Sequence, residues 1–456
     1  MKKLFLIVTF SFIASMALAQ GPEITSWLLN TNGAMGQHYV NGNSTPIQDA
    51  DSVNVKTVLY STNWVYVRAN GVPSYITGPF LDGNPSFTTS QNAIFKISRN
   101  PVQNTGTPTA TNGGNIGIFV NGVALFDYRD GVAWNATSNS LCGGPGNPPC
   151  PGGMGASMDW NRDAIRAERA GFDCAKGHPA MGNYHHHQNP SAFNLDLNVI
   201  STICNLYAAD GLYVIDSTTH SPLIGYAYDG FPIYGAYGYQ NTNGTGGIVR
   251  MKSGYHLRNI TTRTTSPTGA TVTAGPVVST TYPLGYFRED YEYIAAPGQQ
   301  DVLDVHNVRF CVTPEYPNGI YCYFATVDSV WNSAYPYVVG PTFYGTKTAL
   351  KVTSITEPVT VYTPSTSGIN EVKNNLYFNA FPNPSSEFIA VQFSGLLKDD
   401  ITVSLYDLNG RLLQTQTVVA GSTIGYFDVR TLYAGEYILK CTNNEFTSQK
   451  RVTIVK

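Results

Sequence analysis

The sequence predicts a mainly β protein with a few short helices and disulfide bonds, followed by a C-terminal β-sandwich of the immunoglobulin type. Three observations indicate this class. Charged residues make up only 12% of the 456 residues, about half of the ~25% of an average domain. Glycine (44 residues) and tyrosine (30 residues) are abundant, as is typical of strands and tight turns. Segments such as 53–60 and 64–69 alternate apolar and polar residues, which is the pattern of half-buried strands.

The first nineteen residues are expected to be a targeting segment. Lys2 and Lys3 precede an apolar run and the small residues Ala17-Leu18-Ala19, so we expect a secretory signal peptide over residues 1–19. No later apolar run approaches the ~20 residues that a membrane helix needs, so no transmembrane segment is expected. The net charge of −3 and the lack of a basic run argue against nucleic acid as a partner.

Along the exported chain, strands are expected to dominate. The segments that predict them are 53–60, 64–69, 93–98, 116–120, 211–216, 225–235, 308–312, 320–325 and 349–353, with a hairpin turn at Asn121-Gly122. Two segments predict helices. One covers residues 159–170 and ends at Gly171, and the other covers residues 193–206.

The domain organisation follows from a change in composition near residue 356. A β-rich domain is expected over residues 20–355. Residues 356–375 are rich in Thr, Ser, Pro and Asn and are predicted to form a linker. Residues 376–456 contain six short strand patterns separated by turns such as Asn409-Gly410, which predicts the β-sandwich.

Seven cysteines in an exported chain favour disulfides over metal-bound thiolates. Six cysteines allow fifteen pairings, among which we expect Cys142–Cys150, Cys174–Cys204 and Cys311–Cys322. The first pair closes a short Gly/Pro loop, and the last bridges a hairpin around Tyr316–Gly319. Cys441 remains over, as a small buried residue of the C-terminal domain.

The most informative segment of the chain is Tyr184-His185-His186-His187, with His178 seven residues before His185. Residues two apart in an extended segment project to one side, so His185 and His187 can present two imidazoles to one ion while His186 faces away. His178 is a candidate for the third ligand. Imidazoles with mixed nitrogen and oxygen coordination suit zinc or copper, whereas calcium prefers oxygen ligands.

Four further residues are predicted to contribute to this site. His220 is a candidate fourth ligand and His306 a weaker one. Asp229 and Tyr184 are expected to form hydrogen bonds that orient the metal-bound imidazoles. The alternatives remain open: the histidines can form a metal-free hydrogen-bonded network or an acid–base site, and Asp229 can close an Asx-type turn.

Two parts of the sequence resemble known families. Phe381-Pro382-Asn383-Pro384, Val403–Arg411 and Ala434–Ile438 resemble the type IX secretion sorting domain of Gram-negative bacteria. This resemblance implies the type IX secretion machinery as a partner through residues 376–456, export through the periplasm, and release or attachment at the outer-membrane surface, where a cell-surface glycan anchor is one option.

The central region resembles the YHYH family through Gly177-His178-Pro179, Tyr184–His187, His220–Gly235 and Arg309–Gly319. This resemblance implies that the core of the β-rich domain spans about residues 116–345. His186 stands where the eponymous motif has its second tyrosine, and both motif histidines, His185 and His187, are kept. The family implies no settled activity. The hypothesis is therefore a surface protein that binds a transition metal, copper or zinc, with two alternatives: a metal-free structural or glycan-binding protein, and a metal-dependent enzyme, hydrolytic on zinc or redox-active on copper.

Overall fold

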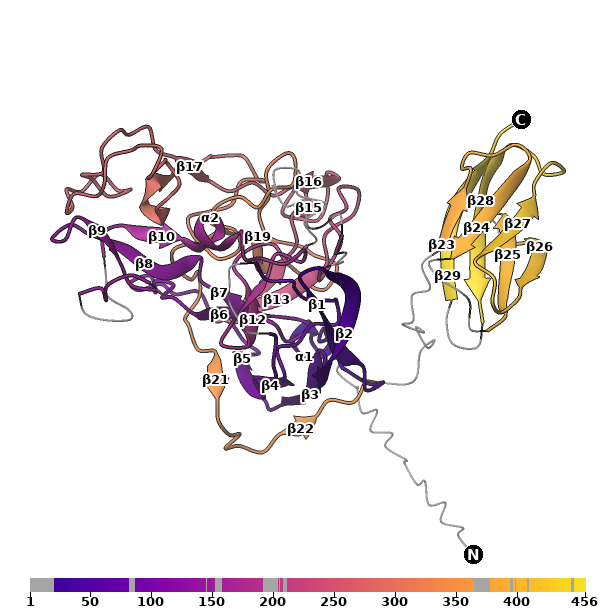
Figure 1. Ribbon diagram of the computed structural model, residues 1–456, viewed down its shortest axis with the longest axis horizontal. Coiled ribbons are helices and arrows are strands. Elements are labelled where there is room, and N and C mark those ends of the chain that lie inside the picture. Colours follow the sequence, from indigo (N-terminus) through magenta and orange to yellow (C-terminus); the bar gives the residue numbers. More distant parts are fainter. Residues whose placement is uncertain are drawn as a thin grey trace, which may run out of the picture. The chain divides into compact units, whose positions relative to one another are not determined.

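The computed structural model describes residues 20–81, 87–144, 146–151, 158–191, 204, 206–207, 211–364, 378–393, 397, 399–407, 410–443 and 447–456 (Figure 1). Contacts divide the chain into one unit, Met1–Tyr362, and a second, Thr363–Lys456. The predicted signal peptide, almost all of the helix predicted at 193–206 and residues 365–375 of the predicted linker lie outside the described residues. Among the described residues, no helix has the length and apolarity that crossing a bilayer requires.

An eight-stranded mixed sheet forms the centre of the first unit. Its strand order is β11-β12-β7-β6-β13-β14-β20-β19, with parallel pairs at β12–β7 and β14–β20. The strands are β6 (Asn115–Phe119), β7 (Ala124–Phe126), β11 (His178–Ala180), β12 (Asn183–His186), β13 (Leu223–Ala227), β14 (Pro232–Tyr234), β19 (Val308–Cys311) and β20 (Ile320–Phe324). Every residue of β13 and β14 is buried, as expected for central strands covered on both faces.

The turn between β6 and β7 requires its glycine, as the sequence predicts. Gly122 has φ +81°, and a Cβ at this position would lie 2.5 Å from the Cβ of Ala69. The chain therefore reverses tightly here, which places β7 beside the histidine strand β12.

A five-stranded antiparallel sheet packs into the same core. Its order is β21-β5-β4-β3-β22, from β3 (Val55–Tyr60), β4 (Trp64–Ala69), β5 (Ala93–Ser98), β21 (Leu350–Val352) and β22 (Thr360–Val361). Strand β22 lies within the segment that composition predicts to be a linker. It is ordered as a strand because Thr360 pairs with Tyr60 at the sheet edge.

Smaller elements complete the first unit. They are α1 (Pro22–Thr25), β1 (Met35–Val40), β2 (Asn43–Ser52), β8 (Arg129–Asn135), β9 (Ser140–Cys142), β10 (Asn161–Asp163), α2 (Ala164–Glu168), β15 (Tyr237–Tyr239), β16 (Ile248–Arg250), β17 (Tyr255–Leu257), η3 (Arg288–Asp290) and β18 (Tyr291–Tyr293).

The helix predicted over residues 159–170 is much shorter than expected. Asn161 pairs with Ala133 and Asp163 with Arg129, so the first part of the segment is strand β10. The Asp163 side chain then accepts a hydrogen bond from the Ile165 amide and caps α2, which ends at Glu168. Tertiary pairing with β8 therefore overrides the local helical tendency.

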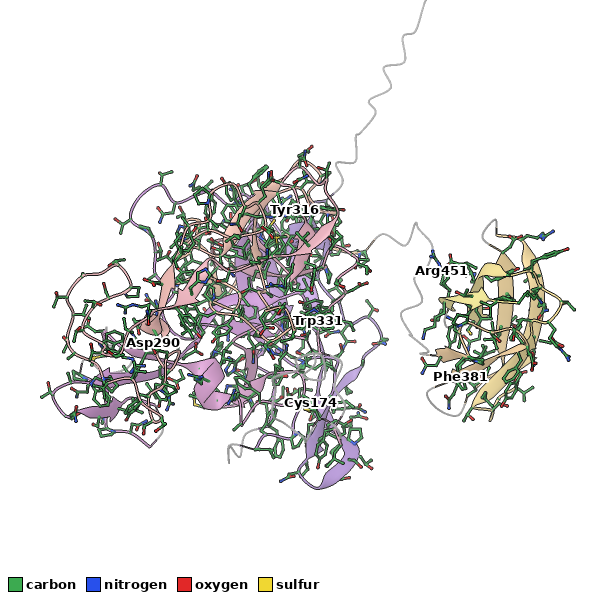
Figure 2. The ribbon with its side chains drawn as sticks, turned by 90° about the horizontal axis from the view of Figure 1, so that it is seen from above. Cys174, Asp290, Tyr316, Trp331, Phe381 and Arg451 are labelled. Carbon is green, nitrogen blue, oxygen red and sulfur yellow. A yellow bond between two sulfur atoms is a disulfide. The ribbon has the colours of Figure 1, made fainter. Side chains whose placement is uncertain are left out.

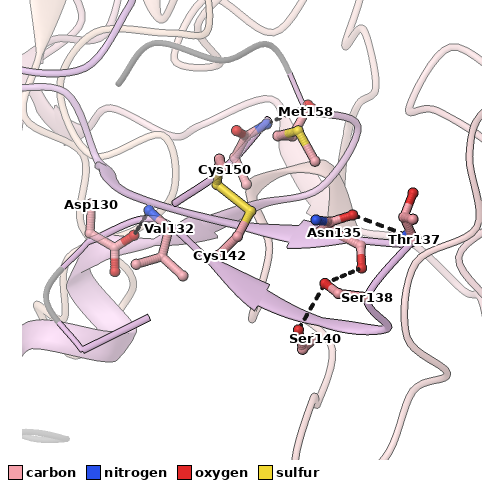
Figure 3. The surroundings of a disulfide bond; sticks show 10 residues. Asp130, Val132, Asn135, Thr137, Ser138, Ser140, Cys142, Cys150 and Met158 are labelled. Atoms are coloured by element: carbon pink, nitrogen blue, oxygen red, sulfur yellow. Dashed lines mark hydrogen bonds between the residues drawn. A yellow bond between two sulfur atoms is a disulfide. The ribbon is translucent and has the colours of Figure 1, made fainter. Parts of the chain in front are cut away.

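Two of the three predicted disulfides are present. Cys142–Cys150 joins the end of β9 to the loop that follows it (Figure 3), and Cys174–Cys204 secures the segment before β11. The predicted Cys311–Cys322 bond is wrong, because both thiols are free and buried. The hairpin β19–β20 exists, but its register places Cys311 opposite Ile320 and Cys322 opposite Arg309, so the cysteines are diagonal neighbours.

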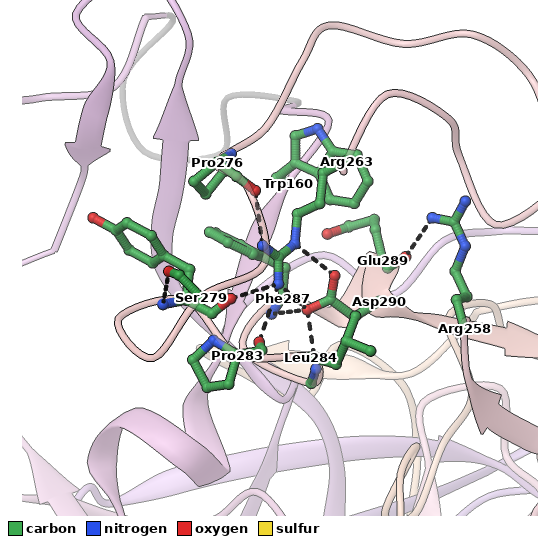
Figure 4. Close-up of polar contacts among 12 residues, drawn as sticks. Trp160, Arg258, Arg263, Pro276, Ser279, Pro283, Leu284, Phe287, Glu289 and Asp290 are labelled. Carbon is green, nitrogen blue, oxygen red and sulfur yellow. Dashed lines mark hydrogen bonds and ion pairs between the residues drawn. The ribbon is translucent and has the colours of Figure 1, made fainter. Parts of the chain in front are cut away.

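A buried ion pair holds the loop-rich region around residues 258–290. The Arg263 guanidinium meets the Asp290 carboxylate at 2.7 and 2.8 Å, and neither side chain is exposed (Figure 4). Arg263 also donates to the carbonyl oxygens of Pro276, Tyr282 and Pro283. This region lies well apart from the Cys174 segment (Figure 2).

The second unit is made of two antiparallel sheets with a shared apolar core. They are β23-β24-β27 and β26-β25-β28-β29, formed by β23 (Phe378–Phe381), β24 (Phe388–Phe393), β25 (Ile401–Asp407), β26 (Leu412–Val418), β27 (Ile424–Asp428), β28 (Gly435–Thr442) and β29 (Thr447–Ile454). This arrangement confirms the predicted β-sandwich and adds the strand β23.

Candidate metal centre

The candidate site is built on the hairpin β11–β12. His178 lies directly opposite His185 in this antiparallel pair, which brings the two imidazole rings within 4.6 Å of each other, centroid to centroid. His187 follows the end of β12 and points to the same side as His185. One nitrogen atom from each of His178, His185 and His187 lies within 4.8 Å of the others, so the three histidines converge as their spacing predicts.

Hydrogen bonds to main-chain carbonyl groups fix the orientation of two rings. His185 Nδ1 lies 2.9 Å from the carbonyl oxygen of Asn183, and His187 Nδ1 lies 2.6 Å from that of Asp127. A carbonyl oxygen can only accept, so each Nδ1 carries a proton, and a ring with no second proton has its lone pair on Nε2. The two Nε2 atoms face each other at 3.1 Å.

Glu168 is a member of the site that the sequence analysis missed. Its Oε2 atom lies 3.1 Å from His178 Nε2 and 3.2 Å from His187 Nε2. Burial alone would raise the pKa of Glu168, but the contacts with His178 and His187 outweigh it and lower the pKa well below its usual range. The residue ends the short helix α2, and no motif in the sequence connects it to the histidines.

Two phenylalanines enclose the imidazoles. Phe126 stacks on His185 with ring centroids 3.9 Å apart, and Phe172 meets His178 edge-on at 4.9 Å. The histidine side chains are nearly buried, with 9% of His178 and 4% of His187 exposed. Burial, and then the neighbouring rings of His187 and His178, lower the pKa of His185 well below its usual range, so this ring stays neutral.

The residues fit a transition metal. Two ligand atoms of a tetrahedral zinc ion with metal–nitrogen distances near 2.05 Å stand roughly 3.3 Å apart. The separations of 3.1 Å between His185 and His187, and of 3.1 and 3.2 Å from Glu168 to its two histidines, are close to this spacing. Main-chain acceptors behind metal-bound imidazoles are also the usual arrangement.

Comparison with known proteins identifies both units. The family described as "YHYH protein" matches residues 94–336, which is more than half of the chain. The chain belongs to the YHYH family. The "secretion system C-terminal sorting domain" matches residues 379–456, so the protein is exported for secretion or for attachment at the outer-membrane surface.

Other comparisons add no argument about function. None of the curated proteins matches the chain. The crystal structure of Parabacteroides merdae beta-glucuronidase shows 16% identity and a TM-score of 0.13 over 18% of this chain, and the match spans 13% of that enzyme's chain.

Within the YHYH domain, His220 and His306 lie elsewhere. His220 packs against Tyr234 and Tyr239, and its Nδ1 donates to the Ser221 carbonyl oxygen at 2.7 Å. His306 Nδ1 contacts Thr342. Among the described residues, neither histidine belongs to the group that could hold a metal, so the structure does not bring these two predicted ligands to the site.

The two residues predicted to support the imidazoles also have other partners. Tyr184 and His186 occupy the opposite face of β12, where the Tyr184 hydroxyl donates to the Asp173 carboxylate at 2.9 Å. Asp229 accepts hydrogen bonds from the Tyr323 hydroxyl at 2.6 Å and the Gly345 amide at 2.8 Å. It also accepts one from the Phe231 amide at 3.3 Å, the contact of an Asx-type turn.

Proposed function

We propose that the YHYH domain binds one transition-metal ion, zinc or copper, through the Nε2 atoms of His178, His185 and His187. The observation that carries this proposal is the pair of Nε2 atoms of His185 and His187, 3.1 Å apart. Both rings direct their Nδ1 protons to carbonyl groups. With both rings neutral, the facing lone pairs repel each other unless a proton or a metal cation lies between them.

The charge of the site supports a cation. Glu168 supplies a carboxylate, while the YHYH hairpin places no lysine or arginine in an ion pair with it among the described contacts. Imidazole nitrogens and a carboxylate oxygen are the ligand types that zinc and copper(II) select.

The test is the metal content of the mature chain, residues 20–456, after periplasmic expression. Elemental analysis is expected to give about one metal per chain, and His185→Ala with His187→Ala is expected to reduce it to near zero. His256→Ala, at an exposed histidine of β17, is the matched control and should retain the metal. Less than ~0.2 metal per reloaded wild-type chain would refute the proposal.

A second candidate is a metal-free network that stiffens the hairpin. The ion-pair distance between His187 Nε2 and Glu168 Oε2, 3.2 Å, is also compatible with a protonated His187. In that case His187 would show two exchange-protected ring N–H signals by NMR at neutral pH, and added metal would leave the spectrum and the melting temperature unchanged.

The sorting domain suggests a test of the destination. Truncation after Tyr362 removes the second unit, so the remaining chain is expected to fold and accumulate in the periplasm. Its appearance at the cell surface would contradict recognition of residues 376–456 by the type IX machinery. Fractionation of the full-length protein, with and without glycan-degrading treatment, separates released protein from a glycan-anchored form.

A further inference from the structure

We propose that Glu168 is the fourth ligand, which closes the coordination sphere and leaves no open position for a substrate. This inference rests on the proposed metal site and deepens it. It assigns the metal a structural role, in which one ion fastens the end of α2 to the hairpin β11–β12.

A single carboxylate oxygen of Glu168 approaches two of the histidines. Oε2 of Glu168 is the atom that approaches both His178 and His187, at 3.1 and 3.2 Å, and it is buried. These separations are close to the 3.1 Å between the Nε2 atoms of His185 and His187. The oxygen thus stands at the spacing of a ligand in the same shell. A general base acting on a metal-bound water would stand farther out, by about the 2.7–2.8 Å of an O–H···O hydrogen bond.

Two phenylalanines form walls of the site. Phe126 covers His185, and Phe172 covers His178 and also stacks over His187 at 6.2 Å. A catalytic zinc site keeps one coordination position for water or substrate, whereas a structural site is closed by four protein ligands. Apolar rings against all three imidazoles, and a carboxylate side chain that is 25% exposed, match the closed type.

The four residues come from three successive elements of the fold. Glu168 ends α2, His178 lies on β11, and His185 and His187 belong to or follow β12. One metal ion would therefore cross-link three successive elements within residues 168–187. Cys174 lies inside this segment and is bonded to Cys204, outside it, so a disulfide would tie to the rest of the chain the same stretch that the metal cross-links.

The experiment uses the mature chain loaded with Co²⁺, a spectroscopic substitute for zinc, and azide as a probe of open positions. Wild-type protein is expected to show the intense visible absorption of four-coordinate cobalt and no change with azide. Glu168→Ala is expected to bind cobalt at least tenfold more weakly and to gain an azide-dependent band. Acetate should compete with azide in this variant by replacing the lost carboxylate.

Two further variants make the result decisive. Glu168→Gln keeps the size of the side chain, so weaker cobalt binding in this variant reflects the lost carboxylate. Glu292→Gln, at a half-buried glutamate of β18, is the matched control and should behave as wild type.

The outcomes separate the two proposals. An azide response in the wild-type protein equal to that of Glu168→Ala would overturn the closed site and leave metal binding intact. Failure of the wild-type protein to bind cobalt, zinc or copper would refute the metal site itself, and the role of Glu168 with it.

Discussion

Two buried polar clusters of the first unit differ in one respect: the balance between hydrogen-bond donors and acceptors. Arg263 brings its guanidinium N–H groups to Asp290 and to three carbonyl oxygens, and Asp290 also receives the amides of Gly285 and Phe287. In this cluster (Figure 4), the guanidinium donors of Arg263 and the carboxylate oxygens of Asp290 are paired with protein groups.

The histidine cluster is unbalanced. The Nδ1 protons of His185 and His187 already bond to main-chain carbonyl groups, so with both rings neutral the Nε2 atoms and the Glu168 carboxylate meet as acceptors. Buried polar groups are normally paired. The comparison teaches that burial alone does not mark a functional site, whereas an excess of buried acceptors indicates a cation.

The largest loss in the free energy of unfolding is expected when the Arg263–Asp290 pair is broken. Arg263→Met leaves the Asp290 carboxylate buried without its cation, and loss of one partner of such a pair costs about 3–5 kcal/mol. Urea unfolding should show this loss, with or without added metal. A loss below ~1 kcal/mol would mean that the two clusters do not differ as argued.

The next largest change in the free energy of unfolding is expected when a metal ion binds to the histidine cluster. At free metal of 100 times the dissociation constant, binding to the folded state adds about 2.7 kcal/mol to the free energy of unfolding. Thermal or urea unfolding of the wild type should show this gain, and a chelator should remove it. The variant His185→Ala with His187→Ala should not respond to metal; an equal gain there would place the metal elsewhere.

A buried carboxylate with hydroxyl and amide donors but no cation is the intermediate case. Asp163 accepts from the Tyr337 hydroxyl at 2.6 Å and the Ile165 amide at 2.9 Å. Burial raises its pKa to about 7, an effect that these hydrogen bonds only partly offset. Because the folded state binds this proton more tightly than the unfolded state, the stability that it contributes below pH ~4 is lost as pH rises to about 7.

Asp163→Asn removes this titration. Its amide oxygen can still accept from the Ile165 amide, while its NH2 group replaces the oxygen that faces Tyr337 and can donate to that hydroxyl. The variant should be more stable than wild type at pH 8, by about 1–3 kcal/mol, and the difference should shrink towards pH 4. Urea unfolding at both pH values measures it. If the stability difference between variant and wild type grew on acidification, burial of the ionised Asp163 carboxylate would not destabilise the folded state.

The smallest effect on metal content is expected at the two distant histidines. His220→Ala and His306→Ala should each keep one metal per chain, because neither ring is grouped with the triad. Elemental analysis checks this. Loss of the metal in either variant would restore that histidine as a ligand.

Local patterns predicted much of the fold. Short strand patterns separated by turns predicted the β-sandwich of residues 376–456, and Asn121-Gly122 located the hairpin that joins β6 to β7. The period of two along residues 184–187 correctly placed His185 and His187 on one face.

The failures depend on tertiary structure. The helix at 159–170 shortened because Asn161 and Asp163 pair with β8. Cys311 and Cys322 lie on the predicted hairpin and interact with each other, but both are free thiols. Glu168 was missed because only the packing of α2 on the hairpin brings it to the histidines.

The most direct test is an anomalous difference map from crystals of the metal-loaded mature protein. The account predicts one peak within about 2.0–2.2 Å of the Nε2 atoms of His178, His185 and His187 and of a Glu168 carboxylate oxygen. A map without a peak at this position, in a protein whose imidazoles bond only to protein groups, would contradict it.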